Sequence, residues 1–303
     1  MHISAAHQLD TLTMIREHLR LLRIHQWVKN LFIFLPLFFS LRIVQAELLE
    51  RAFEAFIAFC LVSSAVYIFN DLRDMEADML HPQKKFRPLA SGTVSGAAAT
   101  ILMVSLTAAG IGLSCKFGST MLSLIILYIL LNAAYSLKLK YILILDIIII
   151  AVGFVIRIFV GGVVTDTNIS MWIVIMTFLL ALFIALAKRR DDVIIYMKTN
   201  TKVRKVVDGY NCAFIDSAMV VMAAVILVSY ILYTVSPDVI AKFSTDKLYF
   251  TSFFVVLGIL RYMQITFVEN NGGSPTEIFI RDRFIQLCLA GWFVTFAVLI
   301  YRV

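Results

Sequence analysis

The segment "NDLRDMEAD", residues 70–78, places four oxygen-bearing side chains at regular spacing: Asn70, Asp71, Asp74 and Asp78. Asn70, Asp74 and Asp78 are spaced i, i+4 and i+8, so on a helix they lie along one face, with Asp71 on its flank. Neighbouring carboxylates repel one another unless a cation lies between them. An oxygen-only set suits Mg²⁺, which keeps water and shares its shell with substrate phosphates. We therefore predict a magnesium site held by these four residues; ordinary acids at a solvated helix end are the alternative.

Basic side chains follow the acidic segment closely. Lys84, Lys85 and Arg87 all lie within ten residues of Asp78. Acids that hold a metal beside bases that hold phosphate oxygens describe a metal–diphosphate site. We predict that Asp78 and Arg87, together with Asp74, are catalytic, and that Lys84 and Arg87 bind the substrate.

The segment "RIHQWVKN", residues 23–30, lies at the start of a weak apolar span. Its Trp27 is typical of a membrane-interface anchor. Lys29 is a candidate catalytic residue and phosphate ligand, and Gln26 is a candidate substrate-binding residue. Snorkelling of Lys29 toward the membrane surface is the alternative interpretation.

A second charged cluster begins at residue 188. It comprises Lys188, Arg189, Arg190, Asp191, Asp192, Lys198, Lys202, Arg204, Lys205 and Asp208. For the Lys and Arg residues, a positive-inside anchor at the cytoplasmic end of a membrane span is the alternative to phosphate binding. The Asp191–Asp192 pair is harder to explain as an anchor, and could hold a second metal or the far side of the first.

The elements that must position these residues are membrane helices. Of the 303 residues, 61% are hydrophobic, and the mean hydropathy is +0.89, whereas soluble domains are about half apolar. We predict an all-α polytopic membrane protein, with residues 1–303 in a single membrane-embedded domain and residues 1–26 as an amphipathic cytoplasmic segment. Nine spans are expected near 27–45, 52–72, 97–115, 119–136, 142–163, 170–187, 212–236, 248–267 and 283–301.

The basic residues predict the orientation in the inner, or cytoplasmic, membrane. With the N-terminus in the cytoplasm, 20 of the 27 Lys and Arg residues fall on the inside, 6 fall outside, and Arg157 lies within a span. The positive-inside rule favours this arrangement, which places both charged clusters on the cytoplasmic side. Arg157 then needs a partner or a wet cavity. Since the net charge of +7 lies beside membrane spans, we expect anionic phosphate ligands and membrane lipids as partners, and no nucleic acid.

The segment "NDLRDMEAD" resembles the first aspartate-rich motif of the UbiA superfamily of intramembrane prenyltransferases. Nine helices with two acidic clusters on the cytoplasmic side also match. The second motif departs from the superfamily's Asp-x-x-x-Asp, because Ile195 stands four residues after Asp191. The decaprenyl-phosphate phosphoribosyltransferase branch is more similar, through "RIHQWVKN", "AYSLKLK", "LALFIALAKRRDD", "DGYN" and "GGSPTEIFIRDR". This resemblance implies a UbiA-like bundle with a cytoplasm-facing active site.

The resemblance also implies a reaction. That branch transfers 5-phosphoribose from phosphoribosyl diphosphate to a polyprenyl phosphate, so we expect these two substrates and Mg²⁺ as the cofactor. The implied substrate-binding set is Gln26, Lys29, Lys84, Arg87, Lys138, Lys188, Arg189, Asp191, Arg204 and Tyr210. A prenyltransferase that acts on an aromatic or other small acceptor is the second hypothesis. A transporter or channel is the third, and it is disfavoured because only the fifth span carries a charge near the midplane.

Overall fold

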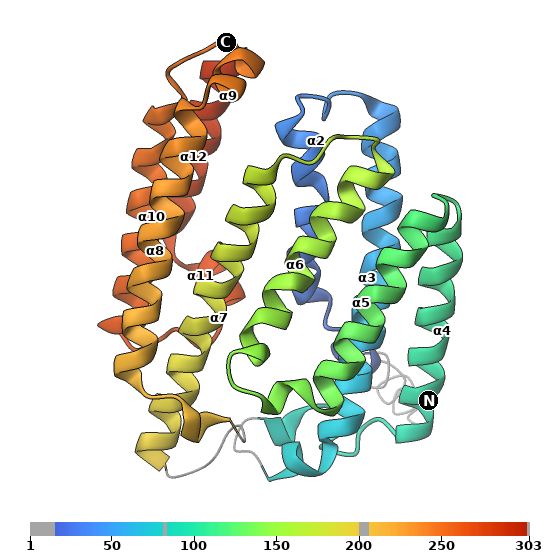
Figure 1. Cartoon of the computed structure of the whole chain (residues 1–303). Coiled ribbons are helices and arrows are strands. Elements are labelled where there is room, and N and C mark those ends of the chain that lie inside the picture. The colour runs from blue at the N-terminus through green and yellow to red at the C-terminus, as the bar shows by residue number, and fades with distance from the viewer. Residues whose placement is uncertain (1–15, 81–83, 200–205, 302–303) are drawn as a thin grey trace, which may run out of the picture. The chain divides into compact units, whose positions relative to one another are not determined.

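The computed structural model describes residues 16–80, 84–199 and 206–301. Within these ranges every regular element is an α-helix or a 3₁₀-helix (Figure 1). Residues 16–26 are the described part of the predicted amphipathic segment 1–26, and residues 16–22 of it are α-helical. The all-α prediction is therefore confirmed.

Eight described helical segments are long and apolar enough to cross a membrane. They are α3 (Ala46–Met79), α4 (Gly96–Cys115), α5 (Ser119–Leu137), α6 (Leu145–Val164), α7 (Met171–Thr199), α8 (Cys212–Val235), η5 with α10 (Leu248–Thr251 and Ser252–Phe267), and α12 (Arg283–Tyr301). The shorter elements are η1 (Ile24–Phe34), α2 (Leu35–Phe39), η2 (Lys84–Phe86), η3 (Leu139–Tyr141), η4 (Val207–Gly209), α9 (Pro237–Phe243) and α11 (Pro275–Arg281).

The first predicted span, 27–45, is not one of these eight segments. It forms the 3₁₀-helix η1, which leads directly into the short helix α2. Pro36 lies in the first turn of α2, where its missing N–H costs no hydrogen bond. The count of nine spans stays a prediction.

Helix α3 is longer than the predicted span 52–72. Its 34 residues extend about 51 Å at 1.5 Å per residue, whereas the hydrocarbon core of a bilayer is about 30 Å thick. The helix continues through the acidic segment because Leu, Arg, Met, Glu and Ala there are good helix formers. Residues 70–78 therefore lie on the last turns of a helix that is longer than the membrane core.

The chain folds into two compact units. The first runs to Ile149 and includes Gly153–Ile169, and the second comprises Ile150–Val152 and the chain from Ser170 onward. In the first unit, α3 packs against α4, α5 and η1. In the second, α7 packs against α8, and α10 packs against α12. The prediction of a single domain over 1–303 stays a prediction.

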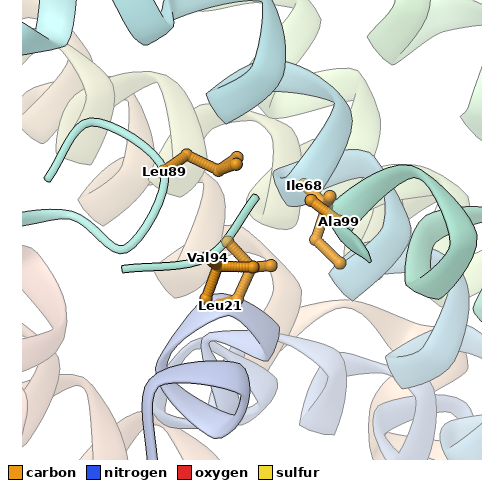
Figure 2. Packing of buried hydrophobic residues seen from close by; sticks show 5 residues of the cluster. All are labelled: Leu21, Ile68, Leu89, Val94 and Ala99. Atoms are coloured by element: carbon orange, nitrogen blue, oxygen red, sulfur yellow. The ribbon is translucent and has the colours of Figure 1, made fainter. Parts of the chain in front are cut away.

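A hydrophobic cluster anchors the basic loop beside the acidic end of α3 (Figure 2). It joins Leu21, Ile68 of α3, Leu89 and Val94 of the loop that follows η2, and Ala99 of α4, each at most 3% exposed. Four segments of chain thus meet around one turn of α3. This packing holds the loop that carries Arg87 next to the row of carboxylates.

Candidate active site

The acidic row on α3 has the geometry that its spacing predicts. Asn70 Nδ2 donates a 3.1 Å hydrogen bond to Oδ2 of Asp74, one helical turn further on. Ser136 Oγ of α5 donates a 3.1 Å hydrogen bond to Oδ1 of Asn70. Asp71 and Asp78 are buried, whereas Asn70 and Asp74 are half-buried. The row therefore offers oxygen atoms in both buried and accessible positions.

Two arginines neutralise the buried carboxylates. Arg87 Nη1 lies 2.5 Å from Asp78 Oδ2 and 3.1 Å from Asp71 Oδ1, so it bridges the two acids. Arg23 Nη2 lies 2.5 Å from Asp71 Oδ1, and its guanidinium lies over the ring of Tyr67. Arg23 has a left-handed backbone conformation at the start of η1, where the chain turns sharply.

A lysine of η3, the short element after α5, pairs with the remaining acid. The ammonium of Lys140 donates to Asp74 Oδ1 and is 7% exposed as a residue. The predicted ligand Lys138 is exposed instead, at the C-terminal end of α5. The α-helix ends at Leu137, and Lys140 lies in the 3₁₀-helix η3 that follows. The structure thus brings Lys140, rather than Lys138, to the acidic row.

The charge repulsion that suggested a metal is already compensated by side chains. Each of Asp71, Asp74 and Asp78 has an Arg or Lys partner. In the described part of the chain, no three His, Cys, Asp or Glu side chains converge into a cage that could hold an ion. The oxygen donors still fit Mg²⁺, because that ion is commonly held by one or two carboxylates, with waters and substrate phosphates completing its shell.

Lys29 lies on η1 and is half-buried. Burial, followed by the positive charges of Arg157 and Arg23, lowers the pKa of its ammonium to about 8. Among the described residues, Lys29 has no hydrogen-bond or ion-pair partner. Gln26 is half-buried on the same 3₁₀-helix, and its backbone N–H donates to Arg23 O.

Two predicted loop residues complete the first unit's set. Lys84 is half-buried and begins η2, and its carbonyl accepts a 2.9 Å hydrogen bond from the Arg87 backbone N–H. This turn fixes the loop that directs Arg87 toward α3. In the first unit, the structure therefore gathers the predicted acids and Arg87, and adds Arg23, Lys140 and Ser136.

The second unit holds the other predicted ligands. Arg189 is buried, and its Nη1 atom lies 3.0 Å from Asp192 Oδ2. Lys188 is half-buried. The carboxylate of Asp191 lies against Gly273, where an added Cβ would be 2.1 Å from Asp191 Oδ2.

Arg190 joins three parts of this second unit. It donates to Asp216 of α8 at 2.7 Å, to Thr266 O at 2.7 Å and to Asn270 Oδ1 at 2.8 Å. Tyr210 is buried at the end of η4. The predicted ligand Arg204 lies outside the described residues.

Sequence reasoning missed Arg23, Lys140 and Ser136 as members of the site. Arg23 precedes "IHQWVKN" directly, and Lys140 is two residues after Lys138, the predicted substrate-binding residue. Neither has a spacing relative to residues 70–78 that would reveal the contact. Their proximity comes from the packing of η1 and α5 against α3.

Comparison with known sequences gives consistent matches. The pattern of the UbiA prenyltransferase family matches residues 32–300. The decaprenyl-phosphate phosphoribosyltransferase of Mycolicibacterium smegmatis is 31% identical over 296 residues, which cover 93% of this chain and 92% of that protein. The decaprenyl-phosphate phosphoribosyltransferase of Corynebacterium glutamicum is 30% identical over 291 residues, which cover 93% of this chain and 86% of that protein.

Solved structures share the fold. A UbiA homologue from Archaeoglobus fulgidus, bound to DMAPP and Mg²⁺, has a TM-score of 0.70. At 18% sequence identity, the alignment covers 93% of this chain and 99% of that one. This likeness is one of architecture.

Proposed function

This chain belongs to the UbiA prenyltransferase family, and we propose that it transfers 5-phosphoribose from phosphoribosyl diphosphate to a polyprenyl phosphate and releases diphosphate. It is a membrane-bound transferase of that family. The relatives named as decaprenyl-phosphate phosphoribosyltransferases support this choice of substrates. The proposed localisation is the inner membrane, with the N-terminus and the site on the cytoplasmic side.

The positive charge of Lys29 favours the phosphoribosyl transfer over the prenyl transfer. Arg23, Arg87 and Lys140 are each matched to a carboxylate of α3. Lys29 is a further cation, with no acidic partner among the described residues. A polyprenyl phosphate brings an anionic headgroup that such a cation would bind, whereas an uncharged aromatic acceptor does not.

The aromatic residues near η1 favour the same reaction. A prenyltransferase forms an allylic cation, which aromatic faces can stabilise. The rings of Phe59, Tyr128 and Phe154 instead surround the guanidinium of Arg157, at 4.7, 5.2 and 5.3 Å from its Cζ. A fixed positive charge at this place disfavours a second cation there and favours an anion.

The acids of α3 would hold the metal. Asn70, Asp71, Asp74 and Asp78 supply oxygen ligands of the kind that Mg²⁺ prefers. When bound, Mg²⁺ would neutralise charge on the diphosphate leaving group. The solved relative bound to DMAPP and Mg²⁺ supports a metal in this role.

The basic residues would bind the donor and its leaving group. A magnesium–diphosphate unit offers Mg²⁺ to the carboxylates and phosphate oxygens to Arg87 and Lys140. It could therefore replace the ion pairs that Arg87 and Lys140 form with those carboxylates. Arg87, with Lys84 beside it, would then donate to diphosphate oxygens as the C1–O bond of ribose breaks. The electron pair of that bond leaves with the diphosphate, and positive charge develops on the ribosyl carbon.

The lipid phosphate is the proposed nucleophile. One of its oxygens, held by Lys29 with Gln26 nearby, would form the new bond to C1. Because that oxygen is already anionic, no strong general base is needed, and catalysis consists mainly of positioning and charge stabilisation. Lys138, Lys188, Arg189, Asp191, Arg204 and Tyr210 remain proposed substrate-binding residues.

A labelling assay tests the proposed function. Purified protein is given Mg²⁺ and phosphoribosyl diphosphate carrying radiolabel in its 5-phosphate, with or without a polyprenyl phosphate. We expect label in the lipid phase only when the polyprenyl phosphate is present, and none with Asp74→Asn. A parallel reaction offers a polyprenyl diphosphate and an aromatic acceptor. Prenylation there, without labelling in the first reaction, would establish the alternative.

A further inference from the structure

Arg157 is a buried charge in the membrane-length helix α6, at 4% exposure. Among the described residues, no carboxylate pairs with it. Its hydrogen bonds go to neutral groups: Asn30 Oδ1 at 2.8 Å, Gly153 O at 2.6 Å and Tyr128 Oη at 3.3 Å. Charged side chains inside membrane helices are costly and commonly serve a function. The reaction proposed above makes no direct use of this one.

Asn30 connects Arg157 to the neighbour of Lys29. It is 1% exposed, and it accepts from Arg157 Nε. Its Nδ2 atom lies 3.1 Å from Cys60 Sγ and 3.2 Å from Ser63 Oγ, both on α3. Asn30 is therefore held by α6 and by α3. Because it directly follows Lys29 in η1, these contacts also fix where Lys29 lies.

The 3₁₀-helix η1 depends on such contacts. Runs of 3₁₀-helix longer than three or four residues are uncommon, because their hydrogen-bond geometry is poor, yet η1 has 11 residues. Gly161 of α6 approaches it so closely that an added Cβ would lie 2.0 Å from Ile33 O. The rings of Phe32 and Phe154 meet edge to face at 5.0 Å. Together with Arg157, these residues make one face of α6 the support for η1.

We propose that Arg157 is a positioning residue, which fixes η1 through Asn30 and acts through its own positive charge on Lys29, so that Lys29 receives a phosphate group. The inference rests on the proposed function for the identity of that phosphate, the headgroup of a polyprenyl phosphate. Arg157 acts through other residues, because its hydrogen bonds are directed to protein groups.

The electrostatics around Lys29 give this role a measurable consequence. Burial, Arg157 and Arg23 together lower the pKa of Lys29 to about 8. Several other titratable groups contact this part of the fold: Cys60 of α3 lies against Asn30, Tyr67 and Asp71 of α3 lie against Arg23, and Tyr128 of α5 lies against Arg157; α2 carries none. Lys29 is therefore protonated below about pH 8 and loses its charge as the pH rises through that value. Phosphate affinity should fall over the same range.

The experiment measures the Kd of the full-length protein in detergent for a polyprenyl phosphate, by calorimetric titration from about pH 6.5 to about pH 9.5. We expect wild-type affinity to decline with a midpoint near pH 8. Lys29→Arg should abolish that decline, because an arginine stays protonated throughout. This variant assigns the titration to position 29.

Two variants separate charge from position. Arg157→Gln removes the charge and should move the midpoint upward, on the order of one pH unit. Asn30→Ala keeps the charge of Arg157 but removes the hydrogen bonds that join η1 to α6 and α3. It should therefore raise Kd about tenfold at pH 7 and leave the midpoint unchanged. Arg42→Gln is the matched control: Arg42 binds the carbonyls of Thr165 and Asp166 beyond α6, and neither quantity should change.

The outcomes distinguish the two proposals. If wild-type protein binds the lipid phosphate with this pH profile but transfers no phosphoribose, the proposed reaction fails and the positioning role stands. If folded Arg157→Gln and Asn30→Ala both keep the wild-type Kd and midpoint, the positioning role is overturned. Should Arg157→Gln fail to fold, Asn30→Ala together with Arg157→Lys, which keeps the charge and loses the guanidinium fork, decides the question by the same two readouts.

Discussion

The Nη1 atom of Arg87 lies 2.5 Å from the Oδ2 atom of Asp78, on the helix that precedes its own loop. Arg87 also reaches Asp71, so one guanidinium compensates two buried carboxylates. The chain therefore turns back on itself after α3, and the hydrophobic cluster around Leu89 holds it there (Figure 2). Both the stability of this end of α3 and the proposed donor site depend on this residue.

Removal of Arg87 should cost both stability and donor binding. Arg87→Ala leaves Asp71 and Asp78 without this partner, and we expect a loss of about 3 kcal/mol, the lower end for a broken buried ion pair, since Arg87 is partly exposed. Thermal unfolding in detergent measures this loss. Arg73→Ala, at an exposed position of the same helix, should change stability by no more than about 0.5 kcal/mol. Equal effects of the two variants would contradict the bridging role.

The acids of α3 should be essential for turnover. Asp74→Asn and Asp78→Asn each remove a charge from the proposed Mg²⁺ ligands and should lower kcat by about 10²-fold or more. Glu76→Gln, at an exposed position of α3, is the control. EDTA should abolish activity, and Mg²⁺ or Mn²⁺ should restore it. Activity that is indifferent to the chelator would refute the metal.

Lys29 should discriminate between the two substrates. Lys29→Ala is expected to raise KM for the polyprenyl phosphate by a factor that corresponds to about 1.5–3 kcal/mol of binding free energy, the contribution of a charge-assisted hydrogen bond. The change in KM for phosphoribosyl diphosphate should be smaller. Steady-state kinetics with each substrate varied in turn measures this. Lys116→Ala, an exposed lysine paired with Glu54, is the control. A loss confined to phosphoribosyl diphosphate would place Lys29 in the donor site instead.

The close approach of α6 to η1 should be intolerant of a single methyl group. Gly161→Ala would place a Cβ 2.0 Å from Ile33 O, so η1 must shift, with a loss of thermal stability and of lipid-phosphate affinity. Gly112→Ala in α4 is the matched control, because no atom lies within 4 Å of its added Cβ. That change should be neutral or stabilising by up to about 1 kcal/mol. Similar effects at both glycines would argue against the packing described for η1.

The orientation is testable by cysteine labelling. In a background without the four native cysteines, of which Cys115 is exposed, single cysteines at Ser91 and Ser274 should react only from the cytoplasmic side. Those at Asn168 and Ser244 should react only from the outside. All four positions are exposed. Labelling of position 91 from outside would invert the orientation and move the proposed site to the other face.

Local patterns predicted much of this structure. The apolar runs predicted all eight membrane-length segments, and the i, i+4 spacing predicted that Asn70 and Asp74 lie on one face of a helix, where they form a hydrogen bond. The partners of those acids were not predictable in the same way. Arg23 and Lys140 come from distant segments, and because the α-helix ends at Leu137, helical spacing could not predict that Lys140 rather than Lys138 is buried. The same limit applies to Arg157, whose need for a partner was evident while its partner, Asn30, was not.

The mass of the lipid product shows directly whether phosphoribose is transferred to the polyprenyl phosphate. Wild-type protein is incubated with Mg²⁺, phosphoribosyl diphosphate and one defined polyprenyl phosphate, and the lipid fraction is analysed by mass spectrometry while released diphosphate is quantified. We predict a lipid that is heavier by one phosphoribosyl group, formed in equal amount to the diphosphate released. An unchanged polyprenyl phosphate under these conditions, with a prenylated aromatic product when a polyprenyl diphosphate is supplied, would contradict it.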